Sequence, residues 1–208
     1  MLRGKEHLVM TALGLFLRNG YSTVSVNDIV HKAGVSKGAF YHHFKSKQEL
    51  LELIFDWWLK EDIYKIIDEI VANNATAHEQ LQRIFKHSVG RVSTSSDLYI
   101  NERIGEDLYS LLVLEGISQS YQLKEKVRVA YSDLIRAYEM VLSNGVKSGE
   151  LKADLDPKMT AINIASQLEG LYTLYVFNRN LNLMEVASRM FGTLWDQIKA
   201  NSVAKEYD

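Results

Sequence analysis

The 208-residue sequence contains no cysteine and only one proline, Pro157. Without cysteine the chain can form no disulfide, thiolate metal site or thiol nucleophile, and with one proline few helices are interrupted. No apolar run approaches the roughly 18 residues that a membrane span requires. The first ten residues include Arg3, Lys5 and Glu6 and do not resemble a signal peptide. These absences predict a cytoplasmic protein that does not associate with a membrane.

Charge is distributed unevenly along the chain, although the net charge is only −2. Residues 1–47 contain seven Lys and Arg against two acidic residues, a net charge of +5 that leaves −7 for the remainder. A basic N-terminal region suggests a polyanionic partner, although a chance fluctuation on a solvated surface would give the same count. At 47% hydrophobic and 24% charged residues, the composition is that of a folded globular protein.

Apolar residues recur at helical spacing along most of the chain, and we find no convincing strand. We predict nine helices, the first ending at Asn19 and the others covering about 25–33, 37–43, 46–72, 76–92, 98–114, 119–147, 157–177 and 183–203. The predicted fold is therefore all-α, with an N-terminal three-helix head (residues 1–45) followed by a larger body of about six helices (residues 46–208).

Several predicted helix ends carry local end signals. Asn19-Gly20 is typical of a left-handed stop. Ser36 and Ser46 are candidate N-caps, and Glu49 would complete a capping box with Ser46. Pro157 follows Asp156 as a first helical residue follows its cap.

Residues 25–43 read as helix, glycine turn, helix. In a helix-turn-helix motif the second helix enters the DNA major groove and the first crosses the backbone. Gly34 suits the sharp turn, and Lys37 lies in the first turn of the second helix, where base edges are met. Lys47 is expected to hold a phosphate. The candidate DNA-binding residues are Ser25, Val26, Ser36, Lys37, Gly38, Ala39, Tyr41, His42 and Lys47. A three-helix corner without a DNA role is the alternative.

Residues 20–50 closely resemble the DNA-binding head of the TetR family of transcriptional regulators. The resemblance is carried by Ala33-Gly34-Val35-Ser36-Lys37-Gly38, Tyr41-His42-His43-Phe44, and Ser46-Lys47 with Leu50. It implies a homodimer whose helical body binds a small-molecule effector that moves the heads apart. Two positions depart from the family pattern: Val24 replaces a frequent hydroxyl, so that Thr23 or Ser25 would have to contact phosphate, and Val30 replaces a frequent alanine.

Aromatic residues are frequent in the body, where they either form the core or line an effector cavity. We expect Trp57 and Tyr64, on the long fourth helix, to face the protein core. The candidate effector-pocket residues are Trp57, Tyr64, His87, Arg103, Tyr109, Tyr138, Asn163 and Gln167.

The last two predicted helices have broad apolar faces, which predict a dimer interface of four helices. Gly170 within the first of them would allow another backbone to approach closely. The candidate interface residues are Leu168, Leu171, Tyr172, Tyr175, Met190, Phe191, Leu194, Trp195 and Ile198. Burial of these faces within one subunit is the alternative.

The resulting prediction is a dimeric repressor that binds a (pseudo)palindromic DNA operator and is released by an unidentified small-molecule effector. The alternatives are a dimeric DNA-binding protein without an effector and an all-helical enzyme. We find no catalytic constellation and expect no cofactor. No metal site is expected either, because adjacent helical residues such as His42 and His43 point about 100° apart, and no H-E-x-x-H pattern surrounds His78 or His87.

Overall fold

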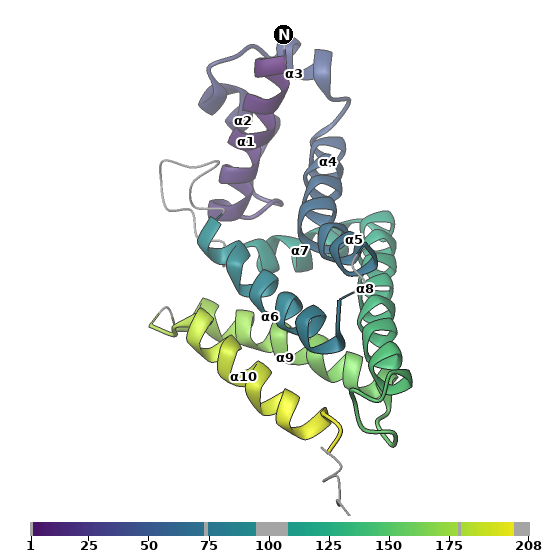
Figure 1. Cartoon of the computed structure of the whole chain (residues 1–208). Helices are drawn as coiled ribbons and strands as arrows, with labels where there is room; N and C mark the ends of the chain where they lie inside the picture. Colours follow the sequence, from purple (N-terminus) through teal and green to yellow (C-terminus); the bar gives the residue numbers. More distant parts are fainter. Residues whose placement is uncertain (1, 73–74, 95–107, 179, 202–208) are drawn as a thin grey trace, which may run out of the picture. The chain divides into compact units, whose positions relative to one another are not determined.

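The computed structural model describes residues 2–72, 75–94, 108–178 and 180–201 (Figure 1). Within these ranges the fold is all-helical, as predicted, and the only pairing of β type is an isolated bridge between Leu151 and Lys199. None of the described helices is long and apolar enough to cross a membrane. The chain divides into two compact units, which comprise Met1–Ile63 with Val92–Ala130, and Tyr64–Arg91 with Tyr131–Asp208.

The first unit contains the predicted three-helix head and more. Its helices are α1 (Leu2–Asn19), α2 (Val26–Ala33), α3 (Lys37–His43), α4 (Lys47–Leu59), α7 (Leu108–Gln119) and the beginning of α8 (Tyr121–Lys147). Both α4 and α7 contact α1. The compact unit therefore includes helices beyond residue 45, and the domain boundary expected there remains a prediction.

The second unit begins within a continuous helical stretch. A π-helical turn, Lys60–Tyr64, joins α4 to α5 (Lys65–Val71), and the sequence had predicted one regular helix there. The remaining helices of this unit are α6 (Ala77–Thr94), the rest of α8, α9 (Pro157–Phe177) and α10 (Leu183–Ile198).

Most local end signals in the sequence are confirmed by the structure. Gly20 and Gly34 adopt positive φ angles of 80° and 67°, and Asp156 caps α9 ahead of Pro157. The Ser46 hydroxyl accepts a hydrogen bond from the Glu49 N–H at 3.1 Å, but the Glu49 carboxylate accepts from the Lys45 N–H at 2.6 Å, so the expected capping box is only half formed. These ends follow from neighbouring residues, which is why the sequence reveals them.

The predicted helix 98–114 differs from the structure. Residues 98–107 lie outside the described part, and α7 continues through Gly116 to Gln119. A Cβ at Gly116 would lie 2.4 Å from Cζ of Phe55, so this glycine serves close packing of α7 on α4 rather than a helix end. The break comes at Ser120, whose hydroxyl accepts a hydrogen bond from Leu123 at the start of α8.

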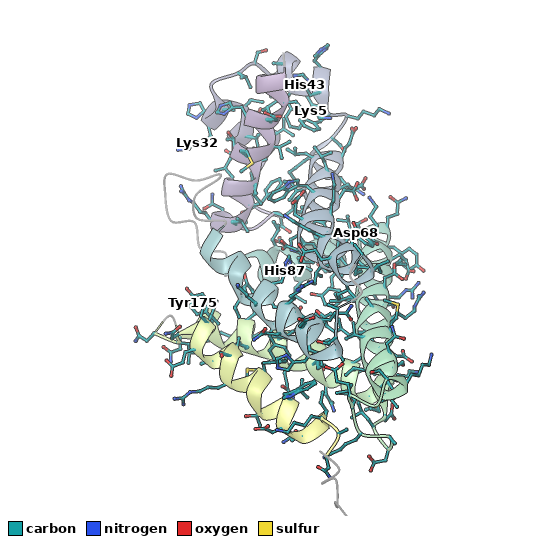
Figure 2. The ribbon with its side chains drawn as sticks, in the orientation of Figure 1. Lys5, Lys32, His43, Asp68, His87 and Tyr175 are labelled. Atoms are coloured by element: carbon teal, nitrogen blue, oxygen red, sulfur yellow. The ribbon has the colours of Figure 1, made fainter. Side chains whose placement is uncertain are left out.

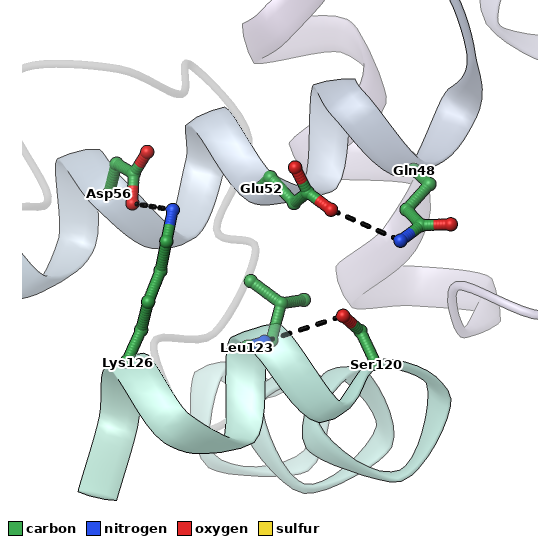
Figure 3. A network of polar contacts seen from close by, with 6 residues as sticks. All are labelled: Gln48, Glu52, Asp56, Ser120, Leu123 and Lys126. Atoms are coloured by element: carbon green, nitrogen blue, oxygen red, sulfur yellow. Dashed lines mark hydrogen bonds and ion pairs between the residues drawn. The ribbon is translucent and has the colours of Figure 1, made fainter. Parts of the chain in front are cut away.

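Polar contacts also join α4 to α8 within the first unit (Figure 3). Lys126 Nζ lies 2.6 Å from Asp56 Oδ1 across the two helices, and both side chains are largely exposed. On α4 itself, the Gln48 amide donates to Glu52 at 3.1 Å. The first unit has a hydrophobic core, to which Phe16, Phe40 and Phe55 contribute buried rings.

Several residues of the predicted dimer interface contribute to the core of the second unit. Leu168, Leu171, Phe191, Leu194 and Ile198 are all buried within the subunit. The Phe191 ring lies 5.1 Å from His78 and 5.8 Å from Phe85 of α6, and Trp195 lies 4.6 Å from His78. Tyr172, Tyr175, Met190 and Trp195 are half-buried. The apolar faces read from the sequence therefore pack mainly inside one subunit, since an apolar stripe indicates burial but not the partner.

The predicted last helix is also shorter than expected, because the chain leaves α10 at Ile198. The Ile198 carbonyl accepts from the Lys152 N–H, and the Ala200 N–H donates to the Glu150 carbonyl, both at 2.9 Å. Pairing with residues 150–152 thus replaces a further helical turn.

Candidate DNA-binding site

The first helix of the motif, α2, begins at a complete capping box. The Ser25 hydroxyl accepts from the Asp28 N–H at 3.2 Å, and Asp28 Oδ2 accepts from the Ser25 N–H at 2.8 Å. The hydrogen bond from the Ser25 side chain, together with that backbone bond, lowers the pKa of Asp28. At the other end Gly34, in the left-handed conformation, turns the chain toward α3.

The second helix, α3, presents an exposed face with hydrogen-bond donors. The Ser36 hydroxyl caps it by accepting from the Ala39 N–H at 3.2 Å, while Phe40 is fully buried. Lys37, Gly38 and His42 are exposed, and 56% of the Tyr41 surface is accessible. A Cβ at Gly38 would meet only the Ser36 hydroxyl, at 3.7 Å, so nothing obstructs an approaching duplex. Val26 and Ala39 are half-buried at the base of the motif.

Lys47 is placed differently from the expectation that it holds a phosphate. Its ammonium donates to the carbonyls of Tyr21 and Val24, each at 2.7 Å, and lies 4.1 Å from the centroid of the Tyr21 ring. Burial lowers the pKa of Lys47, and the nearby carboxylate of Glu115 opposes this shift. The charge is therefore directed into the loop between α1 and α2.

The hydroxyls expected to replace the missing one at Val24 are also engaged locally. Thr23 Oγ1 donates to the carbonyls of Asn19 and Gly20. Ser25 Oγ donates to Asp28 Oδ2 at 2.6 Å, and Val24 itself is buried. In this structure the Thr23 hydroxyl proton is therefore donated within the loop, and the Ser25 hydroxyl proton is donated within the α2 cap.

A family model described as bacterial regulatory proteins, tetR family, matches residues 8–54, which include this whole motif. The Transposon Tn10 TetC protein of Escherichia coli is 33% identical over 136 residues, covering 65% of this chain and 67% of that protein. The chain belongs to the TetR family. It is accordingly a DNA-binding transcriptional regulator.

Solved structures share the fold of this TetR-family chain. A putative transcriptional regulator from Saccharomonospora viridis in complex with choline has a TM-score of 0.75 at 20% identity, covering 97% of this chain and 100% of the other. The regulator FadR from Bacillus subtilis in complex with stearoyl-CoA has a TM-score of 0.69 at 23% identity, covering 91% and 96%. Both likenesses extend over the body as well as the motif.

Further basic residues of this TetR-family head were not in our predicted site. Lys5 of α1 lies 5.6 Å from the ring centroid of Phe44, just after α3, and Lys45 is exposed next to it. Lys32 of α2 is exposed as well, and His43 is half-buried at the end of α3 (Figure 2). The excess of Lys and Arg in residues 1–47 was the sequence signal for the three lysines, whereas His43 belongs to the motif pattern itself.

The candidate effector residues that the structure describes are distributed over both compact units. Trp57 is 39% exposed on α4, whereas Phe55 and Trp58 turn inward there, so the expectation that Trp57 faces the core is wrong. Asn163 and Gln167 lie on the exposed face of α9. Arg103 and the side chain of Tyr109 lie outside the described part of the chain.

Three candidates remain inside the second unit. Tyr138 is buried, and Tyr64 is half-buried, with burial and then the charge of Asp133 raising its pKa. His87 Nδ1 lies 3.9 Å from Glu69 Oε2. Across the described residues, no group of three His, Asp or Glu side chains is arranged to hold a metal ion.

Proposed function

We propose that this TetR-family protein is a cytoplasmic, homodimeric repressor that binds an operator through α3 and is released by a small-molecule effector. The carrying observation is the α2–Gly34–α3 motif, whose second helix exposes Lys37, Tyr41 and His42 beside an unobstructed Gly38. Donors on such a face can reach base edges in the major groove. The relatives that are named transcriptional repressors support this direction of regulation.

Selection of bound sequences from a random duplex pool tests the DNA-binding role of α3. Lys37→Ala should reduce discrimination between the selected operator and single-base variants by roughly 5- to 150-fold at the base it contacts. Lys158→Ala is the matched control, because this exposed lysine at the start of α9 lies outside the head. Unchanged discrimination in Lys37→Ala would remove α3 from the recognition surface.

For the dimer we propose the exposed face of α9 and α10 in place of the buried residues first considered. Met159, Leu174 and Met184 are exposed there, and Phe177 is 82% exposed. On α9, Leu174 and Phe177 are three residues apart and therefore share one face of the helix. The two helices contact each other (Figure 1), and two copies of the pair would form an isologous interface.

Two glycines support the same face. A Cβ built at Gly170 or at Gly192 meets nothing within 4 Å. Each glycine costs about 1 kcal/mol relative to alanine in a helix interior, and no described residue of the subunit lies close enough to require it. Close approach of a second backbone accounts for both positions.

Sedimentation tests this interface. Phe177→Glu places a charge in the proposed contact, where an unpaired charge is costly, and should give a monomer. Val71→Glu changes another exposed apolar residue, at the end of α5, and should leave the dimer intact. A dimer that survives Phe177→Glu and Leu174→Glu would place the interface elsewhere.

The effector is tested by thermal shift, starting with stearoyl-CoA and choline because they occupy two structural neighbours. A ligand that releases the operator must bind the DNA-free protein more tightly, and linkage makes the two effects equal, typically 5- to 150-fold. Its affinity should therefore fall by that factor when operator is present. Equal affinities with and without operator would support the effector-free alternative for that ligand.

A further inference from the structure

The loop between α1 and α2, residues 20–24, is held by two charged side chains. Glu115 of α7 accepts hydrogen bonds from the N–H groups of Tyr21 and Ser22, both at 2.8 Å, and from the Ser22 hydroxyl at 2.6 Å. Lys47 of α4 donates to the carbonyls of Tyr21 and Val24. We call Glu115, Lys47 and the loop residues they bind the α7 clamp.

We propose that Glu115 is a positioning residue for DNA binding: through the α7 clamp it fixes the start of α2, and with it the recognition helix, to α7. This inference rests on the proposed function of α3. The contact joins the loop that precedes the DNA-reading motif to a residue of α7 that is 93 and 94 positions later in the chain.

The loop is well placed to transmit a displacement to the motif. Ser22 is three residues before Ser25, which caps α2, and the intervening Val24 is buried. Gly34 then joins α2 to α3 directly. Because the loop is short and its backbone N–H groups are bound to Glu115, a shift of that carboxylate must move the loop or break these bonds.

The two charges of the clamp depend on each other. Burial alone raises the pKa of Glu115, but the hydrogen bonds from Ser22 and Tyr21 and the charge of Lys47 outweigh it and lower that pKa below its ordinary 4.5. The carboxylate of Glu115 and the ammonium of Lys47 thus favour each other's charged form and oppose the effect of partial desolvation.

The position of α7 is itself tightly defined next to Glu115. A Cβ at Gly116 would lie 2.4 and 2.8 Å from two ring carbons of the buried Phe55 on α4. A movement of α7 along α4 must therefore displace this ring. The same movement shifts Glu115, which is next to Gly116 on α7. The clamp is the route by which such a movement reaches α2.

Glu115→Gln tests the proposal in the full-length protein, with Glu125→Gln as the control because Glu125 pairs with Arg128 three residues along the same helix. Affinity for the selected operator should fall about tenfold, within the usual range of couplings between sites. Affinity for random duplex DNA and the slope of log affinity against log salt should stay unchanged, because no phosphate contact is removed. Hydrogen exchange at the amides of Tyr21 and Ser22 should accelerate about tenfold.

Lys47→Met provides a second, independent variant. As part of the clamp it should weaken operator binding at an unchanged salt slope, whereas a lysine that held a phosphate would lower the slope by about one unit. Ser22→Ala removes a single hydrogen bond and provides the readout if Glu115→Gln does not fold.

The possible failures can be told apart. Unchanged operator affinity in Glu115→Gln, with or without faster exchange, would overturn the positioning role. Equal losses for operator and random DNA would overturn it too, because they would indicate a damaged head. If the wild-type protein bound no DNA, the proposed function itself would fail, and the exchange data would report on the clamp alone.

Discussion

Each compact unit contains a glutamate that accepts hydrogen bonds from two consecutive backbone N–H groups far away in the sequence. In the first unit Glu115 binds those of Tyr21 and Ser22, and in the second Glu150 binds those of Ala77 and His78 at 2.7 and 2.9 Å. A tightly packed glycine accompanies each one. Gly116 lies against Phe55, and a Cβ at Gly145 would lie 2.8 Å from that of Ala77.

The two carboxylates differ in what they bind. Ala77 and His78 begin α6, where the N–H groups have no partner within the helix and the helix dipole favours a negative charge. Glu150 therefore completes a helix end inside the second unit. Tyr21 and Ser22 lie in a loop that leads to the recognition motif, and there a lysine completes the arrangement. A carboxylate that accepts from two backbone N–H groups thus stabilises a helix end in the second unit and orients the DNA-binding motif in the first.

The largest expected effect comes from the glycine beside Glu115. Gly116→Ala forces a Cβ into the ring of Phe55, and overpacking of this kind costs roughly 1–3 kcal/mol of unfolding free energy. Urea denaturation measures the loss. Gly4→Ala, where the nearest atom would be 3.7 Å away, should not lower stability, because alanine is the better helix former. Equal behaviour of the two variants would mean that α7 does not rely on this close approach.

Removing the charge of the second carboxylate separates the two roles. Glu150→Gln keeps one acceptor oxygen but loses the charge and one of the two hydrogen bonds, so thermal stability should fall by about 1 kcal/mol, less than in Gly116→Ala. Operator affinity, measured well below the unfolding temperature, should remain that of the wild type. A tenfold loss of affinity like that expected for Glu115→Gln would show that both carboxylates influence the motif and would end the distinction.

The smallest expected effect concerns the exposed ion pair between α4 and α8. Lys126→Ala removes the contact with Asp56, and exposed pairs contribute only about 0.2–1 kcal/mol. The difference from wild type should vanish in 1 M salt, where charges are screened within about 3 Å. A larger, salt-independent loss would indicate that the aliphatic part of Lys126 supports the packing of the two helices.

Much of the motif could be predicted because its determinants are adjacent in the chain. Ser36 caps α3 through a residue three positions away, and Gly34 supplies a positive φ. The role of Lys47 could not be found in this way, since its carbonyl partners are 26 and 23 residues distant. A lysine beside a recognition motif suggests phosphate binding as long as its neighbours in space are unknown.

The exposed face of α9 shows the same limit. The sequence places Gly170 within an apolar helix, but it does not tell whether Phe191 or Phe177 faces a second subunit. The structure buries Phe191 against α6 and leaves Phe177 in solvent. Hydrophobicity measures the tendency of a side chain to leave water. This tendency does not depend on which apolar surface covers the side chain, so the sequence does not identify that surface.

The sequence by itself determined the all-helical fold, the helix ends with local caps, the helix-turn-helix motif and the family. These features depend on periodicity and on residues within about four positions of one another. Only the tertiary structure decided the partners of Lys47, Glu115 and Glu150 and the division of apolar faces between core and surface. Such contacts join segments separated by tens of residues, and they depend on how helices pack, which no local pattern records.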